Sequence, residues 1–168
     1  MTNLRVEALT CESFAPFGEV IEASEAVRHF PINGGNTERY HDLARLDAGP
    51  DGQLIVSIFR GQPRALPFTI RMMERHPLGS QAFMPLSGQP YLVVVAPPGA
   101  APGAQDLRCF LAGPQQGVNY APGTWHHPLL ALDTVSDFLV LDRSGSTPNC
   151  DETLLEPVAI IPAETLPR

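Results

Sequence analysis

Proline and glycine occur throughout this chain at a density that limits its fold more than any other feature. The 168 residues include 18 prolines and 14 glycines, about a fifth of the chain, against roughly 12 % in an average protein. Proline lacks the backbone N–H that a helix interior needs, and glycine raises the entropy cost of ordering the backbone. We therefore expect short strands joined by many turns rather than long helices.

Strand-like segments recur along the whole chain, at a spacing of about 8 to 12 residues that is typical of all-β sandwiches and barrels. Residues 53–60 alternate, which places Leu54, Val56 and Ile58 on one face of a strand. Residues 91–96 are apolar throughout, as in a strand covered on both faces. Other strands are predicted at 19–22, 67–76, 81–86, 107–111, 117–120, 129–132 and 138–142, and residues 152–155 fit a strand or a short helix. The prediction is one all-β domain over residues 1–168 with minor short helices, such as one capped by Thr10.

The charged residues exclude several classes of function. The chain has 11 basic and 18 acidic residues, a formal charge of −7, and every cation is an arginine. Without a basic stripe, neither nucleic acid nor an anionic membrane is an expected partner. The absence of lysine excludes Schiff-base catalysis by this chain and a P-loop. Three cysteines without C-x-x-C spacing predict free thiols in a cytoplasmic protein.

Two segments place polar side chains that can bind a metal near the ends of predicted strands. Glu74 and His76 are two residues apart, so they point to the same face of a strand, whereas on a helix they would diverge. Gln81 begins the next strand after a Pro-Leu-Gly turn, and a Pro-Gly turn brings His126 to the start of a later one. The strand geometry therefore makes a joint site possible. An apolar barrel would raise the pKa of Glu74 and fit it for proton transfer.

Five other residues with polar or aromatic side chains are expected to have structural roles rather than roles in the site. His29 and His41 are expected to be hydrogen-bonded structural histidines. His127 follows His126 directly, so on a strand it would face away from it. Trp125 is expected to pack at the barrel rim, and Arg75 to make a surface or interface pair.

The two segments together resemble the two sequence motifs of the cupins, which are small double-stranded β-helix barrels with a jelly-roll topology. The pattern Glu-x-His-x4-Gln-x6-Gly of residues 74–88 is similar to the first motif, and a Gly-x2-His that ends at His126 is similar to the second. The resemblance implies that these positions converge inside one barrel, where they hold one divalent metal. Glu74 then takes the place of the first histidine, His76 and His126 keep theirs, and Gln81 replaces a glutamate. A neutral amide is a weaker ligand than that carboxylate.

A narrower resemblance covers about residues 4 to 156. The runs ERHPLGSQAFMPL (residues 74–86) and GVNYAPGTWHHPL (residues 117–129) are similar to the ureidoglycolate lyases, formerly called ureidoglycolate hydrolases. This resemblance implies release of urea from ureidoglycolate to give glyoxylate, in the breakdown of allantoin from purines. It also implies a homodimer and a divalent metal, which is nickel in some members.

The implied substrate carries a carboxylate, a hydroxyl and a ureido nitrogen on one carbon. Its cleavage needs the hydroxyl to lose a proton while the leaving nitrogen gains one, and a metal that chelates the carboxylate and hydroxyl would assist. Beyond the metal ligands, Tyr120, Arg39 and Arg60 are the candidate substrate-binding residues, the arginines because a guanidinium pairs with a carboxylate. Two alternatives stay open: a hydrolase that releases ammonia from the same substrate, and a non-enzymatic cupin that binds a small acid.

Overall fold

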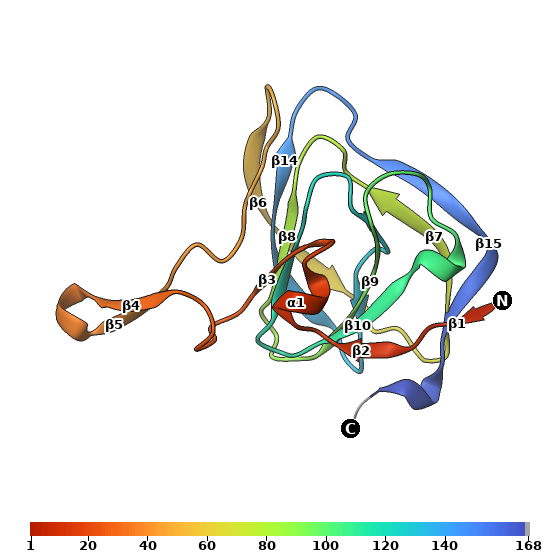
Figure 1. The fold of residues 1–168 in the computed structure, drawn as a ribbon, viewed down its shortest axis with the longest axis horizontal. Coiled ribbons are helices and arrows are strands. Elements are labelled where there is room, and N and C mark those ends of the chain that lie inside the picture. The colour runs from red at the N-terminus through yellow and green to blue at the C-terminus, as the bar shows by residue number, and fades with distance from the viewer. Residues whose placement is uncertain (167–168) are drawn as a thin grey trace.

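A computed structural model describes residues 1–166 of the chain, and these residues form two curled sheets that make a cupin-like half-barrel (Figure 1). The first sheet has the order β1 (Thr2–Asn3), β15 (Asp151–Ile161), β7 (Phe68–Arg75), β12 (Trp125–His126), β9 (Tyr91–Ala96), β10 (Arg108–Ala112) and β2 (Val6–Ala8), with β13 (Leu130–Ala131) also paired to β9. The second has the order β3 (Gly18–Ile21), β11 (Gly117–Tyr120), β8 (Gln81–Pro85), β14 (Ser136–Ser144) and β6 (Gln53–Gly61). The predicted all-β fold class is confirmed.

Strand β9 divides the apolar interior into two clusters. All six of its residues are buried, as the unbroken apolar run predicted. Val94 belongs to a cluster that includes Trp125 and Leu155. Val93 belongs to the other cluster, where Phe110 and Phe138 are fully buried. Alternate side chains of one strand therefore hold both halves of the core together.

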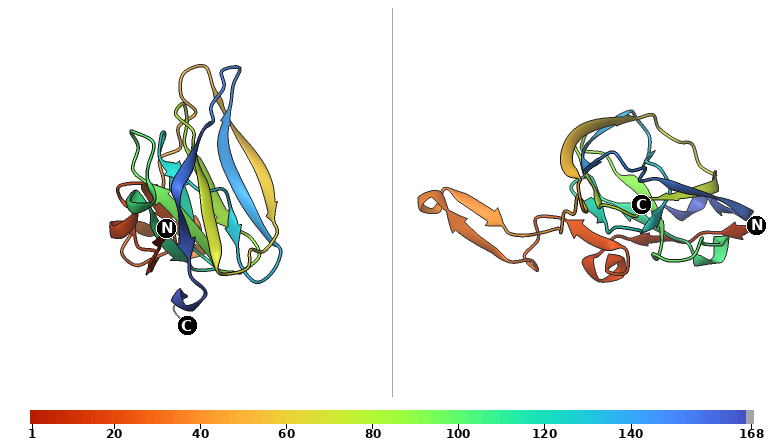
Figure 2. Two further views of the ribbon diagram at one scale, coloured as in Figure 1. Left: turned by 90° about the vertical axis from the view of Figure 1, so that its right-hand side faces the viewer. Right: turned by 90° about the horizontal axis from the view of Figure 1, so that it is seen from above.

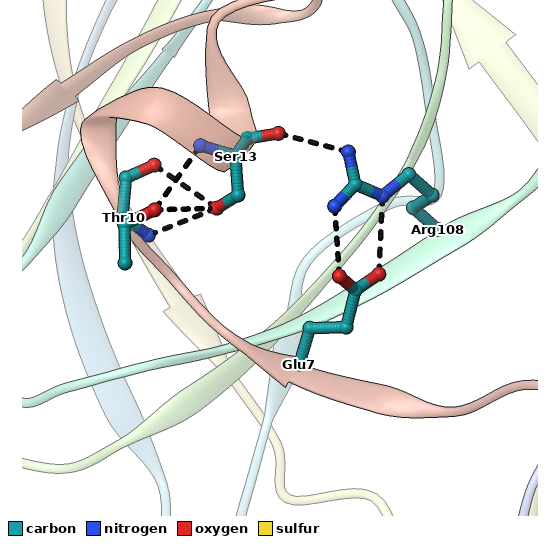
Figure 3. A network of polar contacts seen from close by, with 4 residues as sticks. All are labelled: Glu7, Thr10, Ser13 and Arg108. Atoms are coloured by element: carbon teal, nitrogen blue, oxygen red, sulfur yellow. Dashed lines mark hydrogen bonds and ion pairs between the residues drawn. The ribbon is translucent and has the colours of Figure 1, made fainter.

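The short helix α1 (Cys11–Phe14) begins where the sequence predicted it. Thr10 caps the helix by accepting a hydrogen bond from the backbone N–H of Ser13, and the Ser13 hydroxyl completes the capping box. Figure 3 shows how this cap is tied to strand β10, because Arg108 donates to the carbonyl oxygen of Ser13 and forms a bidentate pair with Glu7. No helix in residues 1–166 is long and apolar enough to cross a membrane.

A projecting hairpin is the main element that the sequence did not predict. Residues 33–36 were expected to form a turn, and they do so within η1 (Asn33–Gly35), where Asn33 and Gly34 have positive φ. On either side of it, β4 (His29–Ile32) and β5 (Thr37–Tyr40) pair only with each other. We call residues 29–40 the arm, which extends well away from the half-barrel (Figures 1 and 2).

The other strand boundaries differ from the prediction by one or two residues, except at β15. Residues 152–155, where strand and helix were both open, lie within this long strand. Short 3-10 turns, η2 (Ala104–Asp106) and η3 (Ala163–Thr165), complete the described elements.

Strand β6 alternates as predicted, but its apolar face is exposed rather than buried. Leu54, Val56 and Ile58 lie on one face, and they are 43 %, 66 % and 55 % exposed. Strand β6 also lies at the edge of the second sheet, where β14 is its only partner strand among the described residues. This apolar outer face therefore has no cover from the described chain.

Candidate active site

Three of the four predicted ligands meet at the inner side of the half-barrel. Glu74 and His126 are direct cross-strand partners on β7 and β12, and His76 follows one residue after β7 ends. Glu74 Oε1 lies 3.4 Å from His126 Nε2 and 3.9 Å from His76 Nε2. One ligand atom from each residue falls within 4.8 Å of the others. The prediction that Glu74 and His76 share a face is therefore confirmed.

The hydrogen bonds of the two histidines leave their Nε2 atoms available for a cation. His76 Nδ1 lies 2.7 Å from the carbonyl oxygen of Asn149, and His126 Nδ1 lies 3.1 Å from that of Thr124. A carbonyl oxygen can only accept, so each Nδ1 carries a proton, and in the neutral ring each Nε2 presents a lone pair. Both Nε2 atoms are buried and make no hydrogen bond. Such orphaned lone pairs beside a carboxylate are a donor set that fits a divalent cation.

Gln81, the fourth predicted ligand, has a fixed amide. It is 6 % exposed, and its Nε2 donates to Oδ2 of Asp142 at 3.1 Å. Its Oε1 is buried and has no hydrogen-bond partner. Gln81 lines the same cavity as Glu74 and His126. This part of the site comes from the second sheet, since Gln81 begins β8.

The cavity beside these residues has a volume of about 330 Å³. Its lining is mostly aromatic and aliphatic, with a few polar groups, as is usual for a small-molecule site. The polar or charged lining residues are Arg60, Glu74, Gln81, Tyr120, His126 and His127. A second hollow of about 460 Å³, lined by His76, Asp142 and Cys150 among others, approaches the cluster from another side. Only a small ligand fits the first cavity.

Tyr120, a predicted substrate-binding residue, packs directly against the cluster. Its ring is buried and stacks on His126, with centroids 4.3 Å apart and planes 9° from parallel. It also lines the cavity. Burial, with a contribution from the charge of Glu74, raises the pKa of Tyr120 above its ordinary value. The hydroxyl therefore stays protonated at neutral pH and can donate a hydrogen bond.

The expected direction of the Glu74 pKa was wrong. Burial does raise it, but His126, and to a smaller extent His76 and His127, more than offset this, so the pKa lies below its ordinary value. The sequence argument treated the barrel as apolar and did not include the imidazoles that surround this carboxyl group. Glu74 is therefore ionised at neutral pH, as a metal ligand must be.

His127 was expected to face away from His126, but it lines the same cavity. Strand β12 ends at His126, so the alternation of a strand does not extend to the next residue. The His127 ring packs edge-on against Phe68, and its Nδ1 lies 2.8 Å from the carbonyl oxygen of Pro128. Burial lowers the pKa of His127, which favours the neutral ring.

The two candidate arginines lie in different parts of the molecule. Arg60 lines the cavity, but its guanidinium forms a bidentate pair with Asp137 at 2.8 and 2.9 Å. Arg39 is exposed on the arm and does not line the cavity. The cavity of a single described chain therefore has no arginine that is free to bind a carboxylate.

The remaining predictions about single residues include one that is wrong: His41 was expected to be hydrogen-bonded, but its buried Nδ1 has no hydrogen-bond partner among the described residues. Arg75 pairs with Asp151 at 2.9 Å and lies over the ring of Trp125, which is buried. His29 is ion-paired with Glu38 on the arm. The three cysteines are free.

Sequence reasoning missed three residues that support or adjoin the cluster. Asp142 holds Gln81, and Asn149 holds His76 through its backbone carbonyl. The Cys150 thiol lies 3.9 Å from Glu74 Oε2, and burial raises its pKa. No spacing rule links these residues to positions 74–81, because they lie more than sixty residues away.

Comparison with known proteins assigns the chain to a family. The family model described as ureidoglycolate lyase matches residues 1–162. The chain belongs to the ureidoglycolate lyase family. A ureidoglycolate lyase of Burkholderia cepacia is 63 % identical over 156 residues, which cover 91 % of this chain and 86 % of the relative. One from Azotobacter vinelandii is 57 % identical (90 % and 92 % covered), and one from Pseudomonas syringae pv. tomato is 54 % identical (93 % and 92 % covered).

Proposed function

We propose that this protein is a lyase that converts ureidoglycolate into glyoxylate and urea. The observation that carries the proposal is the cluster of Glu74, His76 and His126, whose ligand atoms lie within 4.8 Å of one another beside a small cavity. The match to the ureidoglycolate lyase family over residues 1–162 supports this choice of substrate.

We propose that Glu74, His76, His126 and Gln81 hold a divalent cation. Two imidazoles, one carboxylate and one amide suit a borderline transition metal better than calcium or magnesium, and nickel is our first choice from the family resemblance. When bound, the metal supplies Lewis-acid chemistry that lowers the pKa of the substrate hydroxyl. The lone pairs of the two Nε2 atoms and of Gln81 Oε1, which have no other partner, support this assignment.

Glu74 is the only carboxylate among the described residues that line the cavity, so we assign the proton transfer to it. It takes the proton of the substrate hydroxyl as the carbon–oxygen double bond forms. The carbon–nitrogen bond breaks, and the leaving nitrogen receives that proton. The histidines keep the pKa of Glu74 low, and a carboxylic acid with a low pKa gives its proton up readily. Atoms balance without water or a redox cofactor.

The other two candidate residues then bind rather than react. The protonated hydroxyl of Tyr120 donates a hydrogen bond to the substrate. Arg60, at the β6 side of the cavity, draws the anionic substrate inward, although its pair with Asp137 limits that attraction. Arg39 can reach a substrate only in the cavity of a second copy, because it lies on the arm.

A homodimer is the assembly we propose. The exposed outer face of β6 and the arm are both without partners in the described chain, and apolar faces of this kind are typical of subunit interfaces. Light scattering after gel filtration tests this: the double variant Val56→Glu, Ile58→Glu should elute as a folded monomer. As a control, Leu154→Glu changes an apolar residue on β15 that is 76 % exposed, and it should leave the dimer intact. A wild-type monomer would refute the assembly.

The free cysteines support the cytoplasm as the compartment.

Product analysis with purified, metal-defined protein tests the reaction. We expect ureidoglycolate to give urea and glyoxylate in equal amounts, with no ammonia. Glu74→Gln, His76→Ala and His126→Ala should each lose nearly all activity. Glu12→Gln, at an exposed position of α1, is the control and should keep full activity. Ammonia in place of urea would identify a hydrolase instead, and no turnover with any divalent metal would refute the proposal.

A further inference from the structure

We infer that Asp142 is a positioning residue, which fixes the orientation of the Gln81 amide so that its oxygen, not its nitrogen, serves the cation site. The inference deepens the proposed function, because it concerns the same cation. Asp142 itself does not line the cavity with Glu74 and His126; it lines the second hollow, together with His76.

The argument begins with the chemistry of the amide. A glutamine side chain can rotate by half a turn and exchange its oxygen for its nitrogen at almost no steric cost. An ionised carboxylate only accepts hydrogen bonds, so it selects one of the two orientations. In the structure Gln81 Nε2 donates to Asp142 Oδ2 at 3.1 Å, and Oε1 is left buried without a partner. The opposite orientation would place two oxygens against each other and an N–H₂ group toward the cation.

The strands make this contact a rigid one. Strands β8 and β14 are antiparallel, with Ala82 paired to Leu141, so Gln81 and Asp142 are the next residues on each strand. On its other side, Gln81 is paired with Tyr120 of β11. Gln81 thus lies on a strand that is held between two others. Its amide contacts Asp142 and also lines the cavity beside Glu74 and His126.

Asp142 also brings negative charge that the rest of the described chain does not neutralise. No arginine or histidine of residues 1–166 forms an ion pair with it, and the next residue, Arg143, instead donates to the carbonyl oxygens of Ala48 and Pro50. A second carboxylate in contact with the amide adds to the negative potential around Gln81 and so favours a cation at the site. Asp142 thus orients the Gln81 amide through a hydrogen bond and attracts the cation through its charge. Neither effect requires Asp142 to contact the metal.

The first test measures cation affinity directly, without substrate. Asp142→Asn keeps the size of the side chain, but its amide accepts either orientation of Gln81. We expect the dissociation constant for nickel or cobalt(II) to rise about 10- to 100-fold, as when other groups behind a metal ligand are changed, and the visible bands of the cobalt(II) protein to shift. Asp133→Asn is the matched control: it removes the same charge at an exposed position with positive φ, which asparagine tolerates. It should leave affinity and spectrum unchanged.

The second test exchanges the two groups. Gln81→Glu places two carboxylates in contact and should weaken folding, cation binding or both. Adding Asp142→Asn restores one carboxylate and one amide, now with the carboxylate toward the cation, so the double variant should bind at least as tightly as wild type. This reversal is a coupling that two independent structural defects would not produce.

The outcomes separate this inference from the proposed reaction. If the wild type binds the cation, Asp142→Asn weakens binding and yet ureidoglycolate is not cleaved, the positioning role stands and the proposed reaction fails. The inference is overturned if Asp142→Asn binds cobalt(II) with wild-type affinity and spectrum, if the effects of the two substitutions simply add, or if the wild-type protein binds no divalent cation.

Discussion

Asn149 gives the most direct test of how the segment between β14 and β15 holds the cluster. It makes two hydrogen bonds to residues 76–78: its backbone carbonyl accepts from His76 Nδ1 at 2.7 Å, and its side-chain Oδ1 accepts from the backbone N–H of Leu78 at 2.7 Å. The substitution Asn149→Ala deletes only the second bond. The loss of that bond frees the turn that follows His76 and removes the restraint on the carbonyl that orients its ring.

The expected magnitude follows from the burial of this contact. The Leu78 N–H is part-buried, and a buried donor left without a partner costs about 1–3 kcal/mol of unfolding free energy. For a domain of this size that is a fall in melting temperature of roughly 2–10 °C. Because the orientation of His76 depends on the same residue, we also expect cation affinity to fall by about tenfold.

Two measurements on three proteins check this reasoning. Urea unfolding gives the stability, and competition with a chelator gives the cation affinity, for wild type, Asn149→Ala and Asn149→Asp. The aspartate keeps an acceptor at the position of Oδ1, so it should recover most of both properties. An alanine variant with wild-type stability and affinity would show that Asn149 does not hold the turn, and equal losses in both variants would show that the acceptor is not the cause.

Two further substitutions test single contacts. Tyr120→Phe keeps the ring on His126 and removes the hydroxyl, so cation affinity should stay and kcat should fall by roughly 10- to 100-fold, the worth of one hydrogen bond to a charged group; a changed affinity would contradict this division. Glu7→Gln removes the partner of Arg108, whose hydrogen bond, offset in part by burial, lowers the pKa of Glu7. A carboxyl with a lowered pKa stabilises the fold above its unfolded pKa and loses this effect as pH falls through the folded pKa. The variant should therefore be less stable by up to about 1 kcal/mol at pH 7 and equal to wild type near pH 3 by urea unfolding; a difference that persists in acid would contradict it.

Local sequence patterns predicted the strands that carry the site, because their alternation depends only on neighbouring residues. The position of Glu74 and His76 on one face required nothing more than the two-residue period. The Pro-Gly turn predicted a histidine at the start of a strand, and His126 is the second and last residue of β12. The prediction that Gln81 joins them depended on two strands lying in one barrel. The resemblance to a known family supplied that long-range information, which the residues alone did not contain.

The errors have a common physical origin, since each concerns a property set by distant parts of the chain. The pKa of Glu74 depends on His126, fifty-two residues away and opposite it on the next strand. His127 enters the cavity because β12 ends one residue earlier. The spacing of residues within a single segment cannot predict any of these properties.

The site draws its ligands from both sheets, which links cation binding to the folding of the half-barrel. Glu74 and His126 belong to the first sheet and Gln81 to the second, so an unfolded chain cannot present them together. A cation that binds only the folded state, at a free concentration 100 times its dissociation constant, raises the free energy of unfolding by about 2.7 kcal/mol. Urea unfolding with and without nickel should show this gain in wild type. His126→Ala should lose it, while Asp133→Asn should keep it. A gain that survives in His126→Ala would mean that the cation stabilises the protein from another place.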